Sequence, residues 1–343
     1  MIEKIPRLHF ASLPTPLEPA EKLASHLGLS KLFIKRDDLT GLAMGGNKAR
    51  KLEFELAGVL SCGYDTVITV GGQQSNHARM TAAACRKIGL DIKLVLGGED
   101  FSEFKGNLLL DTLFGADIRF IIQSDEDEDL SALQMSWKEE LTIEGKKAYA
   151  MPIGGSTPLG TLGYVKAMEE LRCQIGNEEV QILLPVGSCG TLAGVVLGCG
   201  LYLPSARVIG ISVSRTKEII FSRTRNLIKE TCKIIGAHEK LSEREFEVFD
   251  NYHEAYAVHV KPATEAAAVC AKLEGMLVDQ VYTGKAMAGL FDLALRGVLK
   301  KEKTVIFLHT GGQPEVFADT LKFGEYPKCI KYTVDQVRKG IHP

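Results

Sequence analysis

Short apolar runs of strand-like composition alternate along the chain with longer segments of helical pattern. The runs most typical of strands lie at residues 31–36, 66–72, 92–98, 117–122, 147–155, 181–187, 208–214 and 304–312. Segments such as 76–90 and 262–277 carry helical patterns between them. Strands that alternate with helices predict an α/β fold with largely parallel sheets. Several runs are almost wholly apolar, which indicates sheets covered by helices on both faces.

Four of the predicted strands end in glycine-rich turns. These ends are VGG at 70–72, IGG at 153–155, VGSCG at 186–190 and TGG at 310–312. In open α/β sheets, ligands bind at the carboxyl ends of strands, where glycine lets the backbone come close to them. We therefore expect these four ends to form one composite site.

The longest uncharged stretch, residues 180–206, is long enough to cross a bilayer. Pro185 and Pro204 bracket it, however, and five glycines interrupt it. A strand, a glycine-rich loop and a buried helix are favoured over a membrane span. The first residues, MIEKIPRLHF, show no apolar stretch of the kind found in secretory signals.

Composition and charge narrow the class of protein. The chain has 343 residues, which fits one large or two medium domains, and a formal charge of −2, which does not favour nucleic acid or a membrane surface as partner. The eight cysteines are scattered without CxxC pairs or metal-ligand spacing, so we expect no metal site and a reducing, cytoplasmic compartment. The most basic stretch, residues 214–233, is interpreted as a solvated helix face.

A candidate phosphate site follows the strand predicted at 181–187. The stretch ILLPVGSCGTLAGVVLG, residues 182–198, is typical of a strand, a loop of small residues and a helix. Backbone N–H groups at such a helix start bind anions, and Ser188 and Thr191 add hydroxyl donors. The stretch lacks the GK[ST] and GxGxxG patterns of nucleotide sites, so the phosphate of a small cofactor fits better. A tight turn without a ligand is the alternative.

A second turn of this kind lies in VGGQQSNHARM, residues 70–80. Ser75 and Asn76 are residue types that cap helices. Their N–H groups, with that of His77, could bind a substrate carboxylate, whereas the alternative is a simple helix cap and a structural histidine.

Two stretches near the carboxyl end, VYTGKAMAGL at 281–290 and FLHTGGQPEV at 307–316, hold Tyr282, Thr283 and Thr310 where a ligand could meet them. Packing is the alternative for each of these three residues, and His309 is interpreted as a core histidine.

Lys48 stands in GGNKARK, residues 45–51, between a glycine-rich loop and a predicted helix. A lysine that attacks carbonyl groups is used above all with pyridoxal phosphate, PLP. Such a site needs a phosphate cradle, a partner for the pyridine nitrogen and a group of donors for the substrate carboxylate. The chain contains a candidate for each.

The motifs resemble one known family. IKRDDLTGLAMGGNKARKLEF, GGQQSNHARMTAAA, GSCGTLAG, VYTGKAMAGL and FLHTGG, in this order, are similar to D-cysteine desulfhydrase and 1-aminocyclopropane-1-carboxylate (ACC) deaminase. The resemblance runs from about residue 6 to about residue 325. It implies PLP as cofactor and the tryptophan-synthase β-like fold, with two open, twisted, mostly parallel sheets and flanking helices.

The resemblance implies a cofactor role for several residues. Lys48 would form the internal aldimine and move protons, Asn47 would hydrogen-bond near the cofactor, and Asn76 would bind the 3′ oxygen of the ring. Thr283 and Thr310 would lie near the pyridine nitrogen. The phosphate would be held by Cys189, Gly190 and Thr191.

For the substrate, the resemblance implies that Ser75, Asn76 and His77 receive the carboxylate. Tyr282 and Tyr256 would stand near the substrate as proton donors, acceptors or orienting groups. Lys48, Ser75 and the two tyrosines form the predicted catalytic set, and Thr310 also faces the substrate.

Two positions separate the members of the family. ACC deaminases carry Glu after the motif tyrosine and Leu after the motif histidine, where this chain has Thr283 and Thr310. A carboxylate at the pyridine nitrogen makes the ring a stronger electron sink, which opening a cyclopropane needs more than expelling sulfur does. A hydroxyl leaves the nitrogen largely neutral. The expected activity is therefore β-elimination from D-cysteine to pyruvate, ammonia and hydrogen sulfide.

The stretch HEAYAVHVKP, residues 253–262, departs from the family because Ala255 and Ala257 replace glycines and His259 and Lys261 follow. The added positive charge would suit an anionic substrate. L-cysteate sulfo-lyase, with sulfite as product, and ACC deaminase, with 2-oxobutyrate as product, are therefore the alternatives. A protein that binds a phosphorylated metabolite without chemistry is the alternative from another class.

The resemblance also implies two α/β domains with PLP between them. We expect a large PLP-binding domain of residues 1–48 and 161–343 and a small inserted domain of residues 49–160. A homodimer and a small amino-acid substrate are expected as well.

Overall fold

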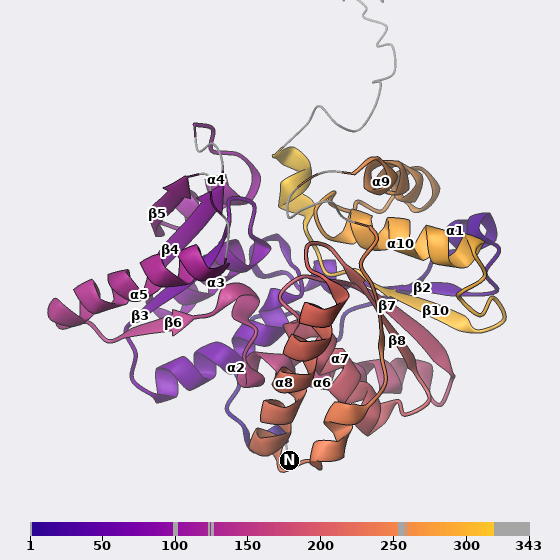
Figure 1. Ribbon diagram of the computed structural model, residues 1–343, viewed down its shortest axis with the longest axis horizontal. Helices are drawn as coiled ribbons and strands as arrows, with labels where there is room; N and C mark the ends of the chain where they lie inside the picture. Colours follow the sequence, from indigo (N-terminus) through magenta and orange to yellow (C-terminus); the bar gives the residue numbers. More distant parts are fainter. Residues whose placement is uncertain are drawn as a thin grey trace, which may run out of the picture.

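Within the residues that the computed structural model describes (2–98, 102–122, 124, 127–252, 258 and 260–318), the strands form two open sheets, one of six strands and one of four (Figure 1). The two sheets and their helices lie side by side, with a seam between them. The predicted fold class is therefore observed.

The six-stranded sheet has the order β1-β2-β10-β7-β8-β9. Only the pair of β1 and β2 is antiparallel, and the other pairs are parallel. Two short edge strands, β1 and β9, were not predicted, because three residues are too few for a recognisable pattern. The strands are β1 Leu17–Pro19, β2 Leu32–Lys35, β7 Val180–Val186, β8 Arg207–Ser212, β9 Glu247–Phe249 and β10 Thr304–Leu308.

The four-stranded sheet has the order β5-β4-β3-β6 and is parallel throughout. Its strands are β3 Thr66–Gly72, β4 Asp91–Gly98, β5 Asp117–Ile122 and β6 Ala148–Met151. They come from one continuous part of the chain, whereas the six-stranded sheet combines strands from before and after it. This membership agrees with an inserted small domain, whose boundaries stay a prediction.

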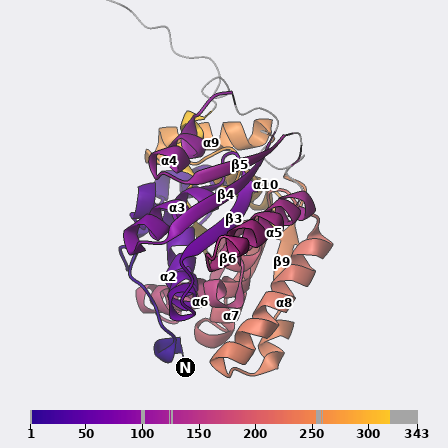
Figure 2. The ribbon, with the colours of Figure 1, turned by 90° about the vertical axis from the view of Figure 1, so that its left-hand side faces the viewer.

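Helices cover both faces of each sheet, and Figure 2 shows the four-stranded sheet between α3 and α5. The α-helices are α1 Glu21–Leu27, α2 Lys48–Ser61, α3 Asn76–Ile88, α4 Gly106–Leu113, α5 Asp127–Ile143, α6 Pro158–Ile175, α7 Gly190–Tyr202, α8 Lys217–Ile235, α9 Lys261–Glu274 and α10 Thr283–Leu295. Short 3₁₀ helices lie at η1 Ile2–Lys4, η2 Asp37–Leu39, η3 Leu42–Met44, η4 Ile153–Gly155, η5 Glu239–Glu243 and η6 Gln313–Phe317.

Side chains alternate along each strand, so successive residues pack against helices on opposite faces of the sheet. Ile182 and Leu184 of β7 pack with α6, α7 and α8, whereas Leu183 packs with α1, α9 and α10. In β3, Val67 packs with α2 and α3, and Ile68 packs with α5. Successive side chains of a strand point to opposite faces, so strands covered on both sides are apolar throughout.

The uncharged stretch 180–206 forms β7, a loop and the buried helix α7, as predicted. Gly194 and Gly198 lie on the face of α7 that meets α6, where a Cβ atom would come within 2.4 Å of Tyr164 and 2.8 Å of Met168. Glycine is needed here because the two helices approach so closely. No helix in the described parts of the chain is long and apolar enough to cross a membrane.

A buried ion-pair network anchors the start of α2 to the six-stranded sheet. Arg50 donates to both carboxylate oxygens of Asp37 at 2.8 and 2.9 Å and to both oxygens of Glu170 at 2.9 Å. Lys35 pairs with Glu170, and the hydroxyl of Tyr164 donates to Asp37 at 2.5 Å. The Arg50 and Lys35 charges hold the pKa of both carboxyl groups below the usual range, against the effect of their burial.

Removal of the Arg50 guanidinium should therefore lower the free energy of unfolding. Arg50→Met leaves Asp37 and Glu170 buried without their main partner, which costs about 3–5 kcal/mol of the free energy of unfolding. Arg296→Met is the matched control, since the Arg296–Asp292 pair is exposed and such pairs contribute about 0–1 kcal/mol. Urea unfolding followed by circular dichroism measures both, and equal losses would contradict this role of the network.

Candidate active site

A cavity of about 800 Å³ lies at the carboxyl ends of the parallel strands. Residues from all four glycine-rich strand ends line it, as predicted from the pattern: Gly71, Gly72, Ile153, Gly154, Gly187, Ser188, Cys189, Thr310 and Gly311. The four-stranded sheet contributes the ends of β3 and β6, and the six-stranded sheet contributes those of β7 and β10. The cavity therefore lies at the seam between the two sheets.

Lys48, the first residue of α2, lines this cavity. Its Nζ donates to Asn47 Oδ1 at 3.1 Å, and Asn47 Nδ2 donates to Thr191 Oγ1 at 2.9 Å. The backbone N–H of Asn47 donates to the carbonyl of Thr310 at 2.9 Å. Asn47 therefore connects the predicted lysine, the predicted phosphate loop and the end of β10.

The surroundings of Lys48 favour its neutral form. Burial, together with the nearby charge of Arg79, lowers the pKa of the Lys48 ammonium from its ordinary value of 10.5 to about 8. A neutral amine is the form that attacks a carbonyl and the form that accepts a proton. The side chain is thus prepared for both tasks near physiological pH.

The start of α3 lies on the opposite side of the cavity. Ser75 caps the helix, because its Oγ accepts the N–H of Ala78 at 3.2 Å. The N–H of Ser75 itself is used by the carbonyl of Gly72, so the prediction that it binds a carboxylate is wrong for this group. Asn76 and His77 begin the helix, where N–H groups have no partner within the helix and are available to an anion.

His77 lines the cavity, and a hydrogen bond with Thr69 fixes its ring. Its Nε2 lies 2.8 Å from Thr69 Oγ1, whose hydroxyl also donates to the carbonyl of Met151, so Nε2 carries the hydrogen. Burial, together with the charges of Lys48 and Lys51, holds the pKa of the imidazole well below its usual range. His77 therefore presents a neutral ring and a backbone N–H to the cavity.

The loop after β7 has the form of an anion site. Cys189 has φ +70°, a conformation that non-glycine residues rarely adopt, and α7 begins at the next residue, Gly190. Strained backbone of this kind gathers at functional sites. Ser188, Cys189 and Thr191 line the cavity, so the predicted cradle is present at the start of α7.

Two further side chains at this loop, those of Lys51 and Ser156, were not identified from the sequence. Lys51 Nζ donates to the carbonyl of Gly154 at 2.5 Å and to Ser156 Oγ at 3.0 Å, and the N–H of Gly190 donates to the same Oγ at 3.2 Å. A Cβ atom on Gly190 would lie 2.5 Å from Lys51 Nζ. Lys51 stands three residues after Lys48, on the same side of α2, and this spacing was the available signal.

The two threonines predicted near the pyridine nitrogen have different surroundings. Thr310 lines the cavity beside Lys48 and Asn47. Thr283 is fully buried and is not among the lining residues, because its hydroxyl donates to Asp279. Asp279 also accepts the N–H groups of Val281, Tyr282 and Thr283, and so it shapes the turn that presents Tyr282 to the cavity. The Thr283 hydroxyl is thus turned to Asp279, and its contact with the cofactor stays a prediction.

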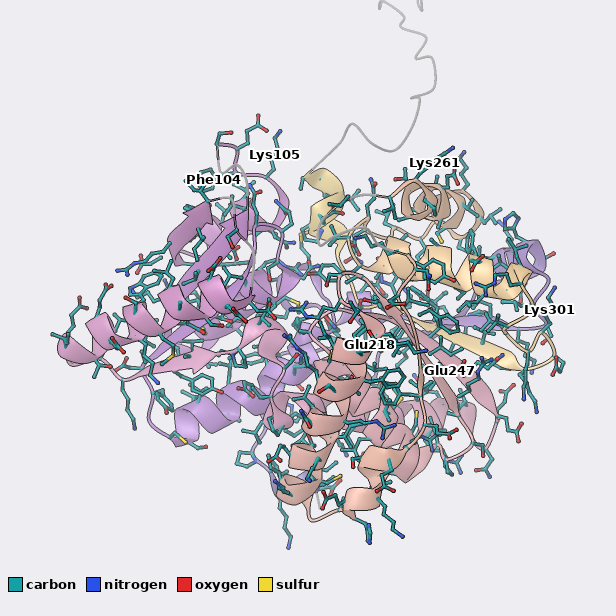
Figure 3. All side chains as sticks on the ribbon, in the orientation of Figure 1. Phe104, Lys105, Glu218, Glu247, Lys261 and Lys301 are labelled. Carbon is teal, nitrogen blue, oxygen red and sulfur yellow. The ribbon has the colours of Figure 1, made fainter. Side chains whose placement is uncertain are left out.

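Tyr256, Ala255, Ala257 and His259 lie outside the described residues. Lys261, the first residue of α9, points outward from the protein (Figure 3). It is exposed, lies 3.6 Å from Glu265, and is not part of the cavity lining. The positive charge that favoured a sulfonate substrate is therefore not supplied by Lys261.

Arginines from another segment do reach the cavity. Arg215 and Arg223 line its mouth and pair with Asp127, the first residue of α5, at 2.5 and 2.9 Å. The interpretation of residues 214–233 as a purely solvated face is wrong for these two side chains. They connect the six-stranded half of the protein to the four-stranded half, a long-range contact that the local sequence pattern does not reveal.

Comparison with known proteins identifies this arrangement. The family of pyridoxal-phosphate dependent enzymes matches residues 9–311. The chain belongs to this family. A putative 1-aminocyclopropane-1-carboxylate deaminase of Pyrococcus abyssi is 41% identical over 320 residues, which are 92% of this chain and 94% of the relative. The relative from Pyrococcus horikoshii with the same name is 41% identical over 315 residues, 91% of this chain and 93% of the relative.

The crystal structure of an ACC deaminase homologue superposes with a TM-score of 0.86 at 39% identity, covering 92% of this chain and 95% of the homologue. O-ureido-L-serine synthase, with a TM-score of 0.66 at 13% identity, shares the fold. PLP is thus the cofactor, and the predictions of fold, family and a PLP-dependent lyase are confirmed.

The residues around the cavity fit this cofactor. Hydroxyl, N–H and ammonium donors surround the start of α7, as a phosphate dianion requires, and Lys48 offers an amine to the aldehyde carbon. Ser188, Cys189, Gly190 and Thr191 would hold the phosphate, and Lys51, which does not itself line the cavity, would support it from directly behind Gly190.

This role of Lys51 has a measurable consequence. A bound phosphate dianion would favour the charged form of Lys51, and Lys51→Met removes that donor, which is worth about 1.5–3 kcal/mol, so the Kd for PLP should rise about 10- to 100-fold. The Kd for pyridoxal, which lacks the phosphate, should change less than about twofold. Lys87→Met, an exposed lysine on α3, is the control. Fluorescence titration measures each Kd, and equal weakening of pyridoxal and PLP would contradict the assignment.

Proposed function

We propose that the protein is a β-eliminating lyase that converts D-cysteine to pyruvate, ammonia and hydrogen sulfide. The observation that carries this proposal is that Thr310, two residues after β10, lines the same cavity as Lys48. Among the described residues, the acidic side chains that line the cavity are Asp127, Glu128 and Asp129, all at the start of α5. A carboxylate at the end of β10 or in the Tyr282 turn, suited to opening a cyclopropane, is not part of the lining.

When bound, PLP supplies an electron sink that stabilises negative charge at the Cα atom of the amino acid. The protein supplies position and proton transfer. The N–H groups of Asn76 and His77 and the hydroxyl of Ser75 would bind the substrate carboxylate at the start of α3. Thr310 would face the pyridine nitrogen and leave it largely neutral.

Lys48 would take the Cα proton. Lys48 lines the cavity, and its pKa of about 8 leaves a larger neutral fraction at neutral pH than an ordinary lysine has. Tyr282, from the turn held by Asp279, is the second candidate for proton transfer, toward the departing sulfur. The thiol leaves as hydrogen sulfide, and addition of one water molecule to the remaining three-carbon unit gives pyruvate and ammonia.

The relatives favour ACC deaminase as the second candidate, since two of them, 41% identical to this chain, carry that name. The same carboxylate and lysine positions would serve both substrates. The surroundings of Thr310 distinguish them, because ring opening of ACC needs a stronger electron sink than elimination of sulfur.

A product assay on PLP-loaded protein tests the proposal. D-cysteine, L-cysteine, L-cysteate and ACC are offered separately, and pyruvate, 2-oxobutyrate, sulfide and sulfite are measured. We expect sulfide and pyruvate from D-cysteine, and nearly complete loss of both in Lys48→Ala. 2-Oxobutyrate from ACC with no turnover of D-cysteine would reject the proposal in favour of the deaminase. Sulfite from L-cysteate alone would reject it in favour of a sulfo-lyase.

A further inference from the structure

Arg79 lies behind the active-site cavity without lining it. It is fully buried on α3, three residues after Asn76. Its Nη1 donates to the carbonyl of Ala43 at 2.5 Å, and its Nη2 donates to the carbonyl of Gly45 at 3.1 Å and to Asn76 Oδ1 at 3.2 Å. One side chain therefore contacts two of the segments that carry predicted cofactor ligands.

The first of these segments is the loop that leads into Lys48. Ala43, Met44, Gly45 and Gly46 all have positive φ, from 45° to 131°. Residues other than glycine rarely adopt this conformation, and it persists only where surrounding contacts stabilise it. The guanidinium binds two carbonyls of this run and so stabilises the backbone immediately before the lysine.

The second segment is the amide of Asn76. Its Oδ1 accepts one hydrogen bond from Arg79 and another from Asn107 Nδ2, at 3.1 Å. Because two donors bind the Asn76 oxygen, the amide is oriented with its NH₂ group away from Arg79 and Asn107. Because Asn76 lines the cavity, it presents a donor there, which is the group required by a negatively charged ring oxygen.

We propose that Arg79 is a positioning residue of the PLP site, which fixes the loop before Lys48 and the amide orientation of Asn76 at the same time. This inference rests on the proposed function, in which Lys48 is the lysine that binds the cofactor.

The charge of Arg79 adds an electrostatic effect. No ion pair in the described part of the chain includes Arg79. The nearby Asp111 makes no side-chain hydrogen bond there, and burial raises the pKa of its carboxyl group well above the usual range, which favours the neutral acid. The guanidinium charge therefore remains effective at Lys48, whose pKa it helps to lower. Two other titratable groups face Lys48: His77, which is neutral, and Lys51, whose own pKa burial lowers well below its usual range.

Three variants separate geometry from charge. Arg79→Lys keeps the charge and loses the planar fork, Arg79→Gln loses both, and Asn107→Ala removes the second donor to Asn76 while leaving Arg79 in place. Lys87→Gln, which removes an exposed cation from the same helix, is the control. Circular dichroism of each variant reports folding.

Two quantities are measured: the Kd for PLP, and the pH dependence of the rate at which the PLP-free protein captures PLP, followed by visible absorbance. The capture rate follows the neutral fraction of Lys48 and so gives its pKa. We expect Arg79→Gln to raise this pKa by about one pH unit and Arg79→Lys to leave it nearly unchanged. Arg79→Lys, Arg79→Gln and Asn107→Ala should each raise the Kd for PLP by about 5- to 10-fold or more, because each loses a buried hydrogen bond.

A Kd for PLP within twofold of the wild type in both Arg79→Lys and Asn107→Ala would overturn the inference, even where Arg79→Gln does not fold. A folded Arg79→Gln with unchanged pKa and Kd would overturn it as well. Failure of the Lys48 assignment looks different, because Lys48→Ala would then still capture PLP, or the wild type would not capture it at all. Failure of the D-cysteine activity appears only in the product assay and changes neither the Kd for PLP nor the pH dependence of its capture.

Discussion

The first turn of α2 carries three basic side chains, those of Lys48, Arg50 and Lys51. The rest of the site depends on which groups accept hydrogen bonds from each of them and on which of them have a carboxylate as countercharge. Arg50 is neutralised by Asp37 and Glu170, while Lys51 donates to Gly154 and Ser156 at the phosphate loop. Lys48 has only the amide oxygen of Asn47 as its hydrogen-bond partner in the described structure, and burial lowers its pKa. Burial lowers the pKa of both lysines, whereas Arg50 stays charged, and Lys48 is the lysine of the two that lines the cavity.

The two halves of the protein contribute different parts of the same reaction. The six-stranded sheet supplies the loop at the end of β7, where the phosphate is proposed to bind, and Thr310 after β10. The four-stranded sheet supplies the start of α3, where the substrate carboxylate is proposed to bind. Lys48 stands between them on α2. The ion pairs of Asp127 with Arg215 and Arg223 connect the halves at the mouth of the cavity. Cofactor and substrate therefore meet at the seam, where elements distant in sequence converge.

Much of this arrangement could be predicted from local sequence. Apolar strands, their glycine-rich ends and the loop VGSCG each carry a short-range pattern, and the structure brings these ends together around Lys48. The failures concern contacts between distant residues. The sequence does not reveal that Thr283 donates to Asp279, that the N–H of Ser75 is used by Gly72, or that Lys261 points away from the cavity. Arg79 could not be identified either, because its partners Ala43 and Gly45 lie on another segment.

The central claim is that Lys48 is the amine that binds PLP. Reduction of the PLP-loaded protein with borohydride, followed by proteolysis and mass spectrometry, locates the lysine that carries the cofactor. The account predicts a phosphopyridoxyl group on Lys48 and none on Lys51. Labelling of Lys51 or of a surface lysine, with Lys48 unmodified, would contradict it.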